Sequence, residues 1–323
     1  MSVGGRASVA AHETLAGVVA RSAAMQEILR LASRLAEARS PVLLEGESGT
    51  GKDLLAHWLH YKGPRRDGPL IKVHCPSIPE ELLESELFGH EKGAFTDARH
   101  AKAGKIELAA GGTLFFDQIE DLSLPLQGKL LRVVEEYKFE RLGGTRTIEV
   151  DVRFVSASRL DLRRAVDAGT FREDLYHRLS VVPLVLPPLR ERREDIQPLA
   201  EAFLVRERER HSTKATAFEP DTAQALLGYR WPGNVRELRA AVERAALYAG
   251  GLSVPVSALP PHVLEEPQTF WSGRPRPPSL KEVEQAYIRH VLQQAGGSQT
   301  KAASALGISR KALWEKRRRY GIP

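Results

Sequence analysis

The sequence is poor in cysteine, with one such residue, Cys75, among its 323. A single cysteine cannot form an internal disulfide, so the chain is not a disulfide scaffold and a reducing setting is expected. Long apolar runs are also missing. The apolar stretch at residues 179–189 carries no charge, but it contains three prolines and is far shorter than the ~20 residues of a spanning helix. The start of the chain lacks the apolar core of an export signal. We therefore expect a cytoplasmic protein with no membrane partner.

Excess charge is confined to one end of the chain. The sequence has 47 Lys and Arg against 41 Asp and Glu, a net charge of +6. Residues 299–323 hold seven basic side chains and one acidic one, which accounts for the whole excess. The pattern is typical of a neutral body that carries a basic module for the phosphate backbone of DNA.

Hydrophobic periodicity divides the rest of the chain. Short apolar runs at 41–44, 113–116 and 152–155 alternate with amphipathic stretches of helix length such as 22–37, which predicts an α/β fold with a parallel sheet covered by helices. Strand signals stop after about residue 190. Seven of the 20 prolines then fall in one short stretch, which indicates a linker. The predicted parts are a disordered tail at 1–13 that is too short for a sensory domain, an α/β nucleotide-binding subdomain at 14–183, a helical lid at 184–250, a linker at 251–279 and an all-α module at 280–323.

A glycine-rich loop directly follows the first apolar run and precedes a helical stretch. It reads Gly46-Glu47-Ser48-Gly49-Thr50-Gly51-Lys52. Glycines let backbone N–H groups and a helix N-terminus face a phosphate, and Lys52 supplies a positive charge for the outer phosphates. Asp53 stands where many such loops have the Ser or Thr that meets Mg²⁺, so metal binding must use other groups. The order of strand, loop, lysine and helix predicts a nucleotide phosphate site.

Asp117 ends the second apolar strand. This is the place where nucleotide triphosphatases present a carboxylate to Mg²⁺ or to its bound waters. We therefore predict Asp117 as the metal ligand.

Six segments follow one another along the chain: GESGTGKD, ESELFGHEKGAFTDA, GGTLFFDQI, GTFREDLYHRL, LPPLRERREDI and RWPGNVREL. In order and spacing they resemble the AAA+ domain of bacterial enhancer-binding proteins, the activators of sigma-54 RNA polymerase. The resemblance implies ATP bound between subunits of a ring, usually a hexamer. A dimer is the alternative for this chain. It also implies that Lys52 contacts phosphate and Asp117 holds Mg²⁺. Arg172 and Arg178 would reach the neighbour's ATP as arginine fingers, and Arg236 would sense nucleotide from the lid.

The chain departs from this family at the catalytic pair. The family's Asp-Glu is Asp117-Gln118 here, and an amide cannot accept the proton of the attacking water. The family's Asn that pairs with the Glu is His74. Either His74 replaces the base or hydrogen-bonds to Gln118, or both positions changed after hydrolysis became dispensable. In the sensor segment Arg159 places a cation where the family has a neutral amide, so we expect at most a weak ATPase.

The loop that the family uses to push on sigma-54 is also altered. This chain keeps Phe95 and Thr96 but has Asp97 in place of the second glycine of GAFTGA. Glycine permits positive φ, which Asp tolerates at a cost, and Asp adds a negative charge at the tip. We therefore expect this change to affect contact with sigma-54 and to leave ATP binding as it is in the family.

The C-terminal module reads as three helices with a turn at Gly307. The last helix is basic, and GISRKALWEKR resembles the Fis-type helix-turn-helix at the end of these activators. The candidate DNA contacts are Arg310, Lys311, Lys316, Arg317 and Arg318.

Three functions are consistent with these observations. The first is an ATP-binding sigma-54 activator with impaired hydrolysis. The second is a DNA-binding regulator, independent of sigma-54, that uses ATP only for assembly. The third is an AAA+ ATPase that remodels another target.

Overall fold

The computed structural model describes residues 18–77, 79–96, 98–264, 279–295 and 298–322. The chain forms two compact units, Met1–Pro260 and Pro261–Pro323, which are described separately. The predicted tail at 1–13 lies outside the described residues. No helix in the described ranges is both long enough and apolar enough to cross a membrane.

The first unit is built on a five-stranded parallel sheet with the order β2-β5-β8-β1-β9. The central strand β8 is buried along its whole length, and β5 is buried up to its last residue, as expected for strands covered on both faces. The strands are β1 (Val42–Glu45), β2 (Leu70–His74), β5 (Thr113–Asp117), β8 (Arg153–Ser158) and β9 (Pro183–Val185).

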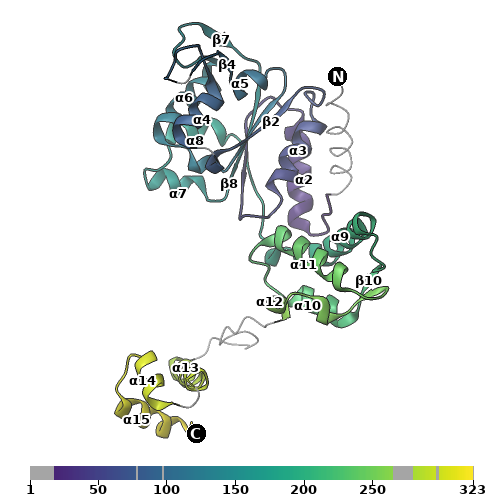
Figure 1. Ribbon diagram of the computed structural model, residues 1–323, viewed down its shortest axis with the longest axis vertical. Coiled ribbons are helices and arrows are strands. Elements are labelled where there is room, and N and C mark those ends of the chain that lie inside the picture. Colours follow the sequence, from purple (N-terminus) through teal and green to yellow (C-terminus); the bar gives the residue numbers. More distant parts are fainter. Residues whose placement is uncertain (1–17, 78, 97, 265–278, 296–297, 323) are drawn as a thin grey trace. The chain divides into compact units, whose positions relative to one another are not determined.

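Helices cover both faces of this sheet (Figure 1). One core packs α2 (Ala23–Ala36) and α3 (Lys52–Lys62) against the sheet. The other core packs five further helices against the second face of the sheet. These helices are α4 (Glu80–Phe88), α5 (Lys105–Leu108), α6 (Leu124–Glu136), α7 (Leu162–Asp167) and α8 (Glu173–Leu179). Two antiparallel pairs, β3 (Gly89–His90) with β4 (Lys102–Ala103) and β6 (Lys138–Glu140) with β7 (Thr147–Glu149), extend this side.

Buried polar groups join the start of α2 to the segment that leads into the lid. The fully buried carboxylate of Asp195 accepts hydrogen bonds from the N–H groups of Arg21, at 2.5 Å, and Ser22, at 2.7 Å. It also accepts one from the Ser22 hydroxyl at 2.8 Å. The lid therefore begins from a fixed point on the α/β core.

The lid contains α9 (Ile196–His211), α10 (Pro220–Gly228) and α11 (Asn234–Tyr248), with α9 packed on α11. Trp231, in the predicted break between α10 and α11, is fully buried and donates its indole N–H to the carbonyl of Leu226 at 2.9 Å. The expectation that strands stop in this region is wrong. Ala217–Phe218 (β10) pairs in parallel with Ser253–Val254 (β11), because the chain returns past the lid after α11.

The predicted linker at 251–279 also starts too early. Its first residues form β11 and the short helix Val256–Ala258 (η5), which packs on α10 and α11. Val254 and Leu259, on either side of η5, are buried. These apolar side chains hold the segment to the lid despite its prolines. A one-turn helix, α12 (Pro261–Leu264), follows, and residues 265–278 lie outside the described ranges.

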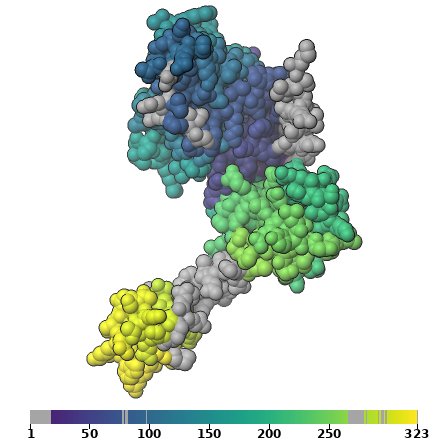
Figure 2. Space-filling view, viewed as in Figure 1, coloured from purple at the N-terminus to yellow at the C-terminus, as the bar shows by residue number. Residues whose placement is uncertain are grey.

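The second unit carries α13 (Leu280–Gln294), α14 (Gln299–Ala305) and α15 (Arg310–Tyr320), as the sequence predicts. These helices form one body, coloured yellow in Figure 2. A small core joins them through Ile288, Val291, Leu292, Ala302, Ala303, Leu313 and Ile322. Gly307, with φ 65°, makes the turn before α15, and the Ser309 hydroxyl caps α15 by accepting from Ala312 N–H at 3.1 Å.

Candidate nucleotide site

The phosphate loop is a tight turn that depends on three glycines. Gly46, Gly49 and Gly51 have φ of 143°, 78° and 108°, values that residues with a side chain rarely adopt. Space excludes a side chain as well, because a Cβ on Gly49 would lie 2.3 Å from the carbonyl oxygen of Gly233. The middle of the loop therefore touches the lid.

Lys52 opens α3 and points back into the loop. Its side chain is buried, and Nζ donates to the carbonyl oxygens of Gly46 at 2.5 Å and Glu47 at 2.9 Å. Burial lowers the pKa of Lys52, and the carboxylates of Glu120 and Asp117 work in the opposite direction. An anion in this loop would meet a desolvated positive charge together with a helix N-terminus.

The first residues of α11 bind the outside of the loop. Asn234 Nδ2 donates to the Ser48 carbonyl oxygen at 3.0 Å, and Val235 N–H donates to that of Gly49 at 3.0 Å. Arg236 Nη1 donates to Ser48 Oγ at 2.7 Å. Arg236, predicted as a sensor from the sequence, is thus in direct contact with the phosphate loop.

Two arginines that sequence reasoning missed brace the same loop. Arg190 forms a two-pronged pair with Glu47, with N–O distances of 2.6 and 2.8 Å, and this pair lowers the pKa of Glu47. The buried Arg192 donates to the Thr50 carbonyl oxygen at 2.6 Å. Both lie in the segment LPPLRERREDI, whose three arginines the sequence alone does not distinguish.

The ends of β2 and β5 bring three predicted residues together. The strand register pairs His74 with Asp117. His74 Nδ1 lies 3.1 Å from Asp117 Oδ2 and 3.5 Å from Gln118 Nε2. The second distance is at the outer limit of a hydrogen bond, so the main partner of His74 is Asp117. A carboxylate that accepts from Nδ1–H leaves Nε2 as the nitrogen that can take up a proton.

A third missed residue, Lys72 on β2, lies between two carboxylates. Its Nζ is 2.5 Å from Asp53 Oδ1 and 2.9 Å from Asp117 Oδ2. Burial lowers the pKa of Lys72, but the hydrogen bonds to both carboxylates outweigh burial and raise it overall. Two carboxylates that converge on one cation are oxygen donors of the kind that Mg²⁺ takes, so Asp53 and Asp117 fit a magnesium site.

These groups share one cavity of about 700 Å³, a size that suits a nucleotide. The predicted residues that line it are Ser48, Gly49, Gly51, Lys52, Asp53, His74, Asp117, Gln118 and Arg236. Arg159 also lines it, but its guanidinium pairs with Glu120 at 3.0 Å and Asp121 at 2.9 Å. The cation expected near a γ-phosphate is therefore held by two acidic groups.

The two predicted arginine fingers do not line this cavity. Arg172 precedes α8 and pairs with Asp174 through Nε at 3.0 Å and Nη2 at 2.7 Å. Arg178 donates from Nε to Glu135 Oε1 at 2.6 Å. Both side chains are exposed, 43% and 59%, which leaves them on the surface of the α/β unit.

The predicted sigma-54 loop presents an aromatic side chain. Phe95 is 42% exposed and its ring meets His90 edge-on at 4.9 Å. Thr96 is exposed, and Asp97 lies outside the described residues. Ala98 N–H donates to the Phe95 carbonyl at 2.9 Å.

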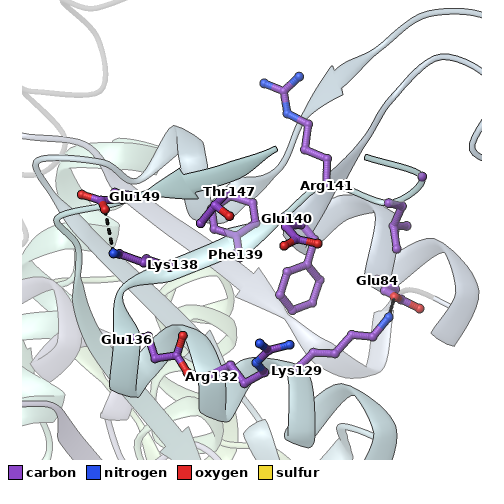
Figure 3. Close-up of a pocket in the computed structure, with 13 residues that line it drawn as sticks. Glu84, Lys129, Arg132, Glu136, Lys138, Phe139, Glu140, Arg141, Thr147 and Glu149 are labelled. Carbon is purple, nitrogen blue, oxygen red and sulfur yellow. Dashed lines mark hydrogen bonds and ion pairs between the residues drawn. The ribbon is translucent and has the colours of Figure 1, made fainter. Parts of the chain in front are cut away.

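A second cavity, of about 660 Å³, is lined by residues of α4, α6, β6 and β7 (Figure 3). Lys138 pairs with Glu149 at 2.8 Å across its wall, and Lys129 reaches Glu84. Its lining carries four acidic and four basic side chains. With no excess positive charge it does not select phosphate, unlike the first cavity.

The predicted DNA contacts of α15 fall into two groups. Arg310, Lys311 and Arg318 are exposed, and the Arg318 guanidinium stacks on the Trp314 ring at 5.6 Å. Lys316 instead forms an ion pair with Glu284 of α13. Arg317 is half-buried. The exposed group is the better placed to meet a phosphate backbone.

The fold and the site define a class of protein. A parallel sheet, a phosphate loop, a carboxylate at the end of the neighbouring strand and a lid bound to the loop make an AAA+ nucleotide-binding domain, here followed by a helix-turn-helix. Family models agree with this assignment. The sigma-54 interaction domain matches residues 18–185, the AAA+ ATPase lid domain residues 190–271, and the Fis family of bacterial regulatory proteins residues 279–320.

Curated relatives cover nearly the whole chain. The regulatory protein AtoC of Escherichia coli (strain K12) is 45% identical over 312 residues, which is 94% of this chain and 68% of AtoC. The transcriptional regulatory protein ZraR of Salmonella typhimurium is 45% identical over 93% of this chain and 68% of ZraR. The Nif-specific regulatory protein of Herbaspirillum seropedicae is 42% identical over 95% of this chain, which spans 62% of that protein, less than two thirds.

Solved structures give the same result. NtrX from Brucella abortus in complex with ADP matches with a TM-score of 0.72 and 32% identity, over 98% of this chain and 73% of that one. Its complex with ATP matches with a TM-score of 0.71. The chain therefore belongs to the sigma-54-dependent transcriptional activators, and the predicted family and fold class are confirmed.

Proposed function

We propose that the chain is a cytoplasmic, ATP-dependent transcriptional regulator that binds DNA through α13–α15 and acts on sigma-54 RNA polymerase. The observation that carries the proposal is the buried Lys52 ammonium, which lies in a glycine loop that Arg236 touches from the lid. The match of the sigma-54 interaction domain to residues 18–185 does not favour the two alternatives, a sigma-54-independent regulator and an ATPase for another target.

ATP is the proposed nucleotide. Backbone N–H groups of the phosphate loop and Lys52 would hold its outer phosphates, and Arg236 would meet them from the lid. NtrX, which matches nearly the whole chain, was solved with ADP and with ATP, and this supports the choice.

Mg²⁺ is the proposed metal, with Asp117 and Asp53 as the carboxylates that hold it. Bound there, the metal would neutralise charge on the phosphates. Lys72 already bridges the two carboxylates, so it must yield part of its contact when the metal binds. We infer that Lys72 competes with Mg²⁺ for this position.

Hydrolysis is proposed to be weak. Gln118 cannot act as a general base. The amide stands where the family has a Glu, and loss of that base removes a contribution of about 10²–10⁴-fold to the rate of hydrolysis. His74 is the replacement that the contact with Asp117 supports, because the carboxylate fixes the ring and leaves Nε2 to accept a proton. The rate of ATP hydrolysis then depends on His74 rather than on Gln118, the residue that follows Asp117.

A ring, with a hexamer expected and a dimer as the alternative, would complete the site. Arg172 and Arg178 are exposed and lie outside the cavity of their own chain, as residues that reach a neighbour's ATP must. Phe95 and Thr96, with Asp97, would face sigma-54. We keep the α/β part at 14–183, place the end of the lid near Pro260 and assign 280–323 to DNA binding.

The test is nucleotide binding by Lys52→Ala. ATP should raise the melting temperature of the parent chain and leave that of Lys52→Ala unchanged, because the loop loses its buried positive charge. Lys62→Ala, at the exposed end of the same helix, is the matched control and should behave as the parent does. Equal stabilisation of Lys52→Ala and the parent would refute the site.

A further inference from the structure

Three potential metal ligands meet in the lid, on two helices that pack together. Glu207 and His211 lie four residues apart on α9 and therefore on one face of it. Glu243 reaches them from α11. The imidazole nitrogen and the carboxylate oxygens that these residues offer all lie within 4.8 Å of one another.

The separations suit a tetrahedral metal. His211 Nε2 is 3.3 Å from Glu207 Oε2 and 3.8 Å from Glu243 Oε1. Zinc bonds of 2.0–2.2 Å at tetrahedral angles put neighbouring ligand atoms roughly 3.3–3.6 Å apart. The two distances from His211 match this spacing to within a few tenths of an ångström, and the two carboxylate oxygens lie within 4.8 Å of each other.

Glu207 supplies an independent sign that a cation belongs here. It is 2% exposed, and among the described residues its Oε2, the atom aimed at His211, has no hydrogen-bond partner. Burial of a carboxylate oxygen that accepts no hydrogen bond is costly, and His211 Nε2, at 3.3 Å, is an ion-pair contact only. Besides His211, the described cation near the cluster is Arg210, whose Nη1 is 3.8 Å from Glu243 Oε1 and whose side chain is 60% exposed.

We propose that Glu207, His211 and Glu243 bind a divalent transition metal, with zinc preferred. One imidazole and two carboxylates suit zinc, whereas the imidazole disfavours Mg²⁺ and Ca²⁺, which take oxygen ligands. Water would fill the fourth position. The proposal is independent of ATP and of sigma-54.

The metal would clip α9 to α11. Glu243 lies two helical turns beyond Arg236, whose side chain contacts the phosphate loop from the same helix. The site would therefore stabilise the helix that presents Arg236 and Asn234 to the loop. Its effect is structural, and none of its three ligands lines the nucleotide cavity.

The experiment titrates zinc alone into the full chain after treatment with EDTA. Calorimetry should show one zinc per chain with micromolar or tighter affinity, and zinc should raise the melting temperature. His211→Ala and Glu243→Gln should each weaken binding by more than about tenfold. Both residues are partly exposed, so these variants should fold, which Glu207→Gln need not do.

The matched control is His177→Ala. His177 and Glu173 form a similar pair on α8, with His177 Nε2 3.7 Å from Glu173 Oε1, but α8 is not part of the three-ligand cluster. This variant should retain the parent's zinc binding. If the parent binds no zinc at micromolar concentration, or if His211→Ala and Glu243→Gln bind it as tightly as the parent, the cluster is an ion pair and the proposal fails.

Discussion

Acid should destabilise the nucleotide domain through His60, a buried histidine beneath the site. His60 is 2% exposed on α3, the helix that Lys52 opens, and its Nδ1 lies 2.9 Å from the hydroxyl of Thr113 on β5, the strand that Asp117 ends. Burial, with a smaller contribution from the neighbouring His57, lowers the pKa of His60 from 6.5 to about 4. The folded chain therefore holds the imidazole neutral where the unfolded chain takes up a proton.

The sign and size of the effect follow from the folded and unfolded pKa of His60. Its contribution to stability is fully present above the unfolded pKa of 6.5 and is lost as the pH falls from there to the folded pKa of about 4. The full loss is about 3 kcal/mol, because each tenfold change in proton affinity corresponds to about 1.36 kcal/mol. Between pH 7 and pH 5 the same linkage gives about 2 kcal/mol.

Urea unfolding followed by circular dichroism at pH 7 and pH 5 measures this loss. The decrease in unfolding free energy between the two pH values should be about 2 kcal/mol smaller for His60→Gln than for the parent. His57, half-buried on the same helix, is the control, and His57→Gln should keep most of the parent's pH dependence, because burial is the larger cause of the low pKa of His60. If His60→Gln loses as much stability on acidification as the parent, the buried histidine is not the cause.

Three further predictions concern the site and the DNA module. Gln118→Glu combined with His74→Asn should raise ATP turnover by up to about 10²–10⁴-fold, whereas His74→Ala alone should lower it; a parent already as fast as the double variant would contradict the weak-ATPase proposal. Lys72→Met should tighten Mg²⁺ binding, measured by calorimetric titration, by roughly 30-fold. This factor corresponds to about 2 kcal/mol, the repulsion in water between one positive charge and a divalent ion about 4 Å away. Lys72→Arg, which keeps the charge, is the control in the same titration. Arg310→Ala with Lys311→Ala should flatten the slope of log K for DNA against log salt by up to about 1.8, and Lys316→Ala by less; an unchanged slope for the pair would remove them from the interface.

Local patterns were sufficient for the parts of this protein that are continuous in sequence. The strand, glycine loop and Lys52 helix follow from residue types with fixed backbone preferences, and Asp117 follows from the end of an apolar run. The three C-terminal helices follow from their periodicity and from the turn at Gly307. The family followed from six segments in order, and the comparisons confirm it. The roles of individual site residues remain predictions.

Only the tertiary structure decided which side chains meet. Lys72 is an ordinary strand lysine until the order of the sheet places β2 beside β5 and so brings it to Asp53 and Asp117. Arg190 and Arg192 become braces of the phosphate loop because the chain enters the lid past that loop. Lys316 pairs with Glu284, 32 residues earlier, instead of being exposed as Arg318 is. The pairing of β10 with β11 and the cluster of Glu207, His211 and Glu243 likewise join residues far apart in the chain. Sequence periodicity fixes which face of an element is apolar, but contacts between elements depend on packing, which no local pattern records.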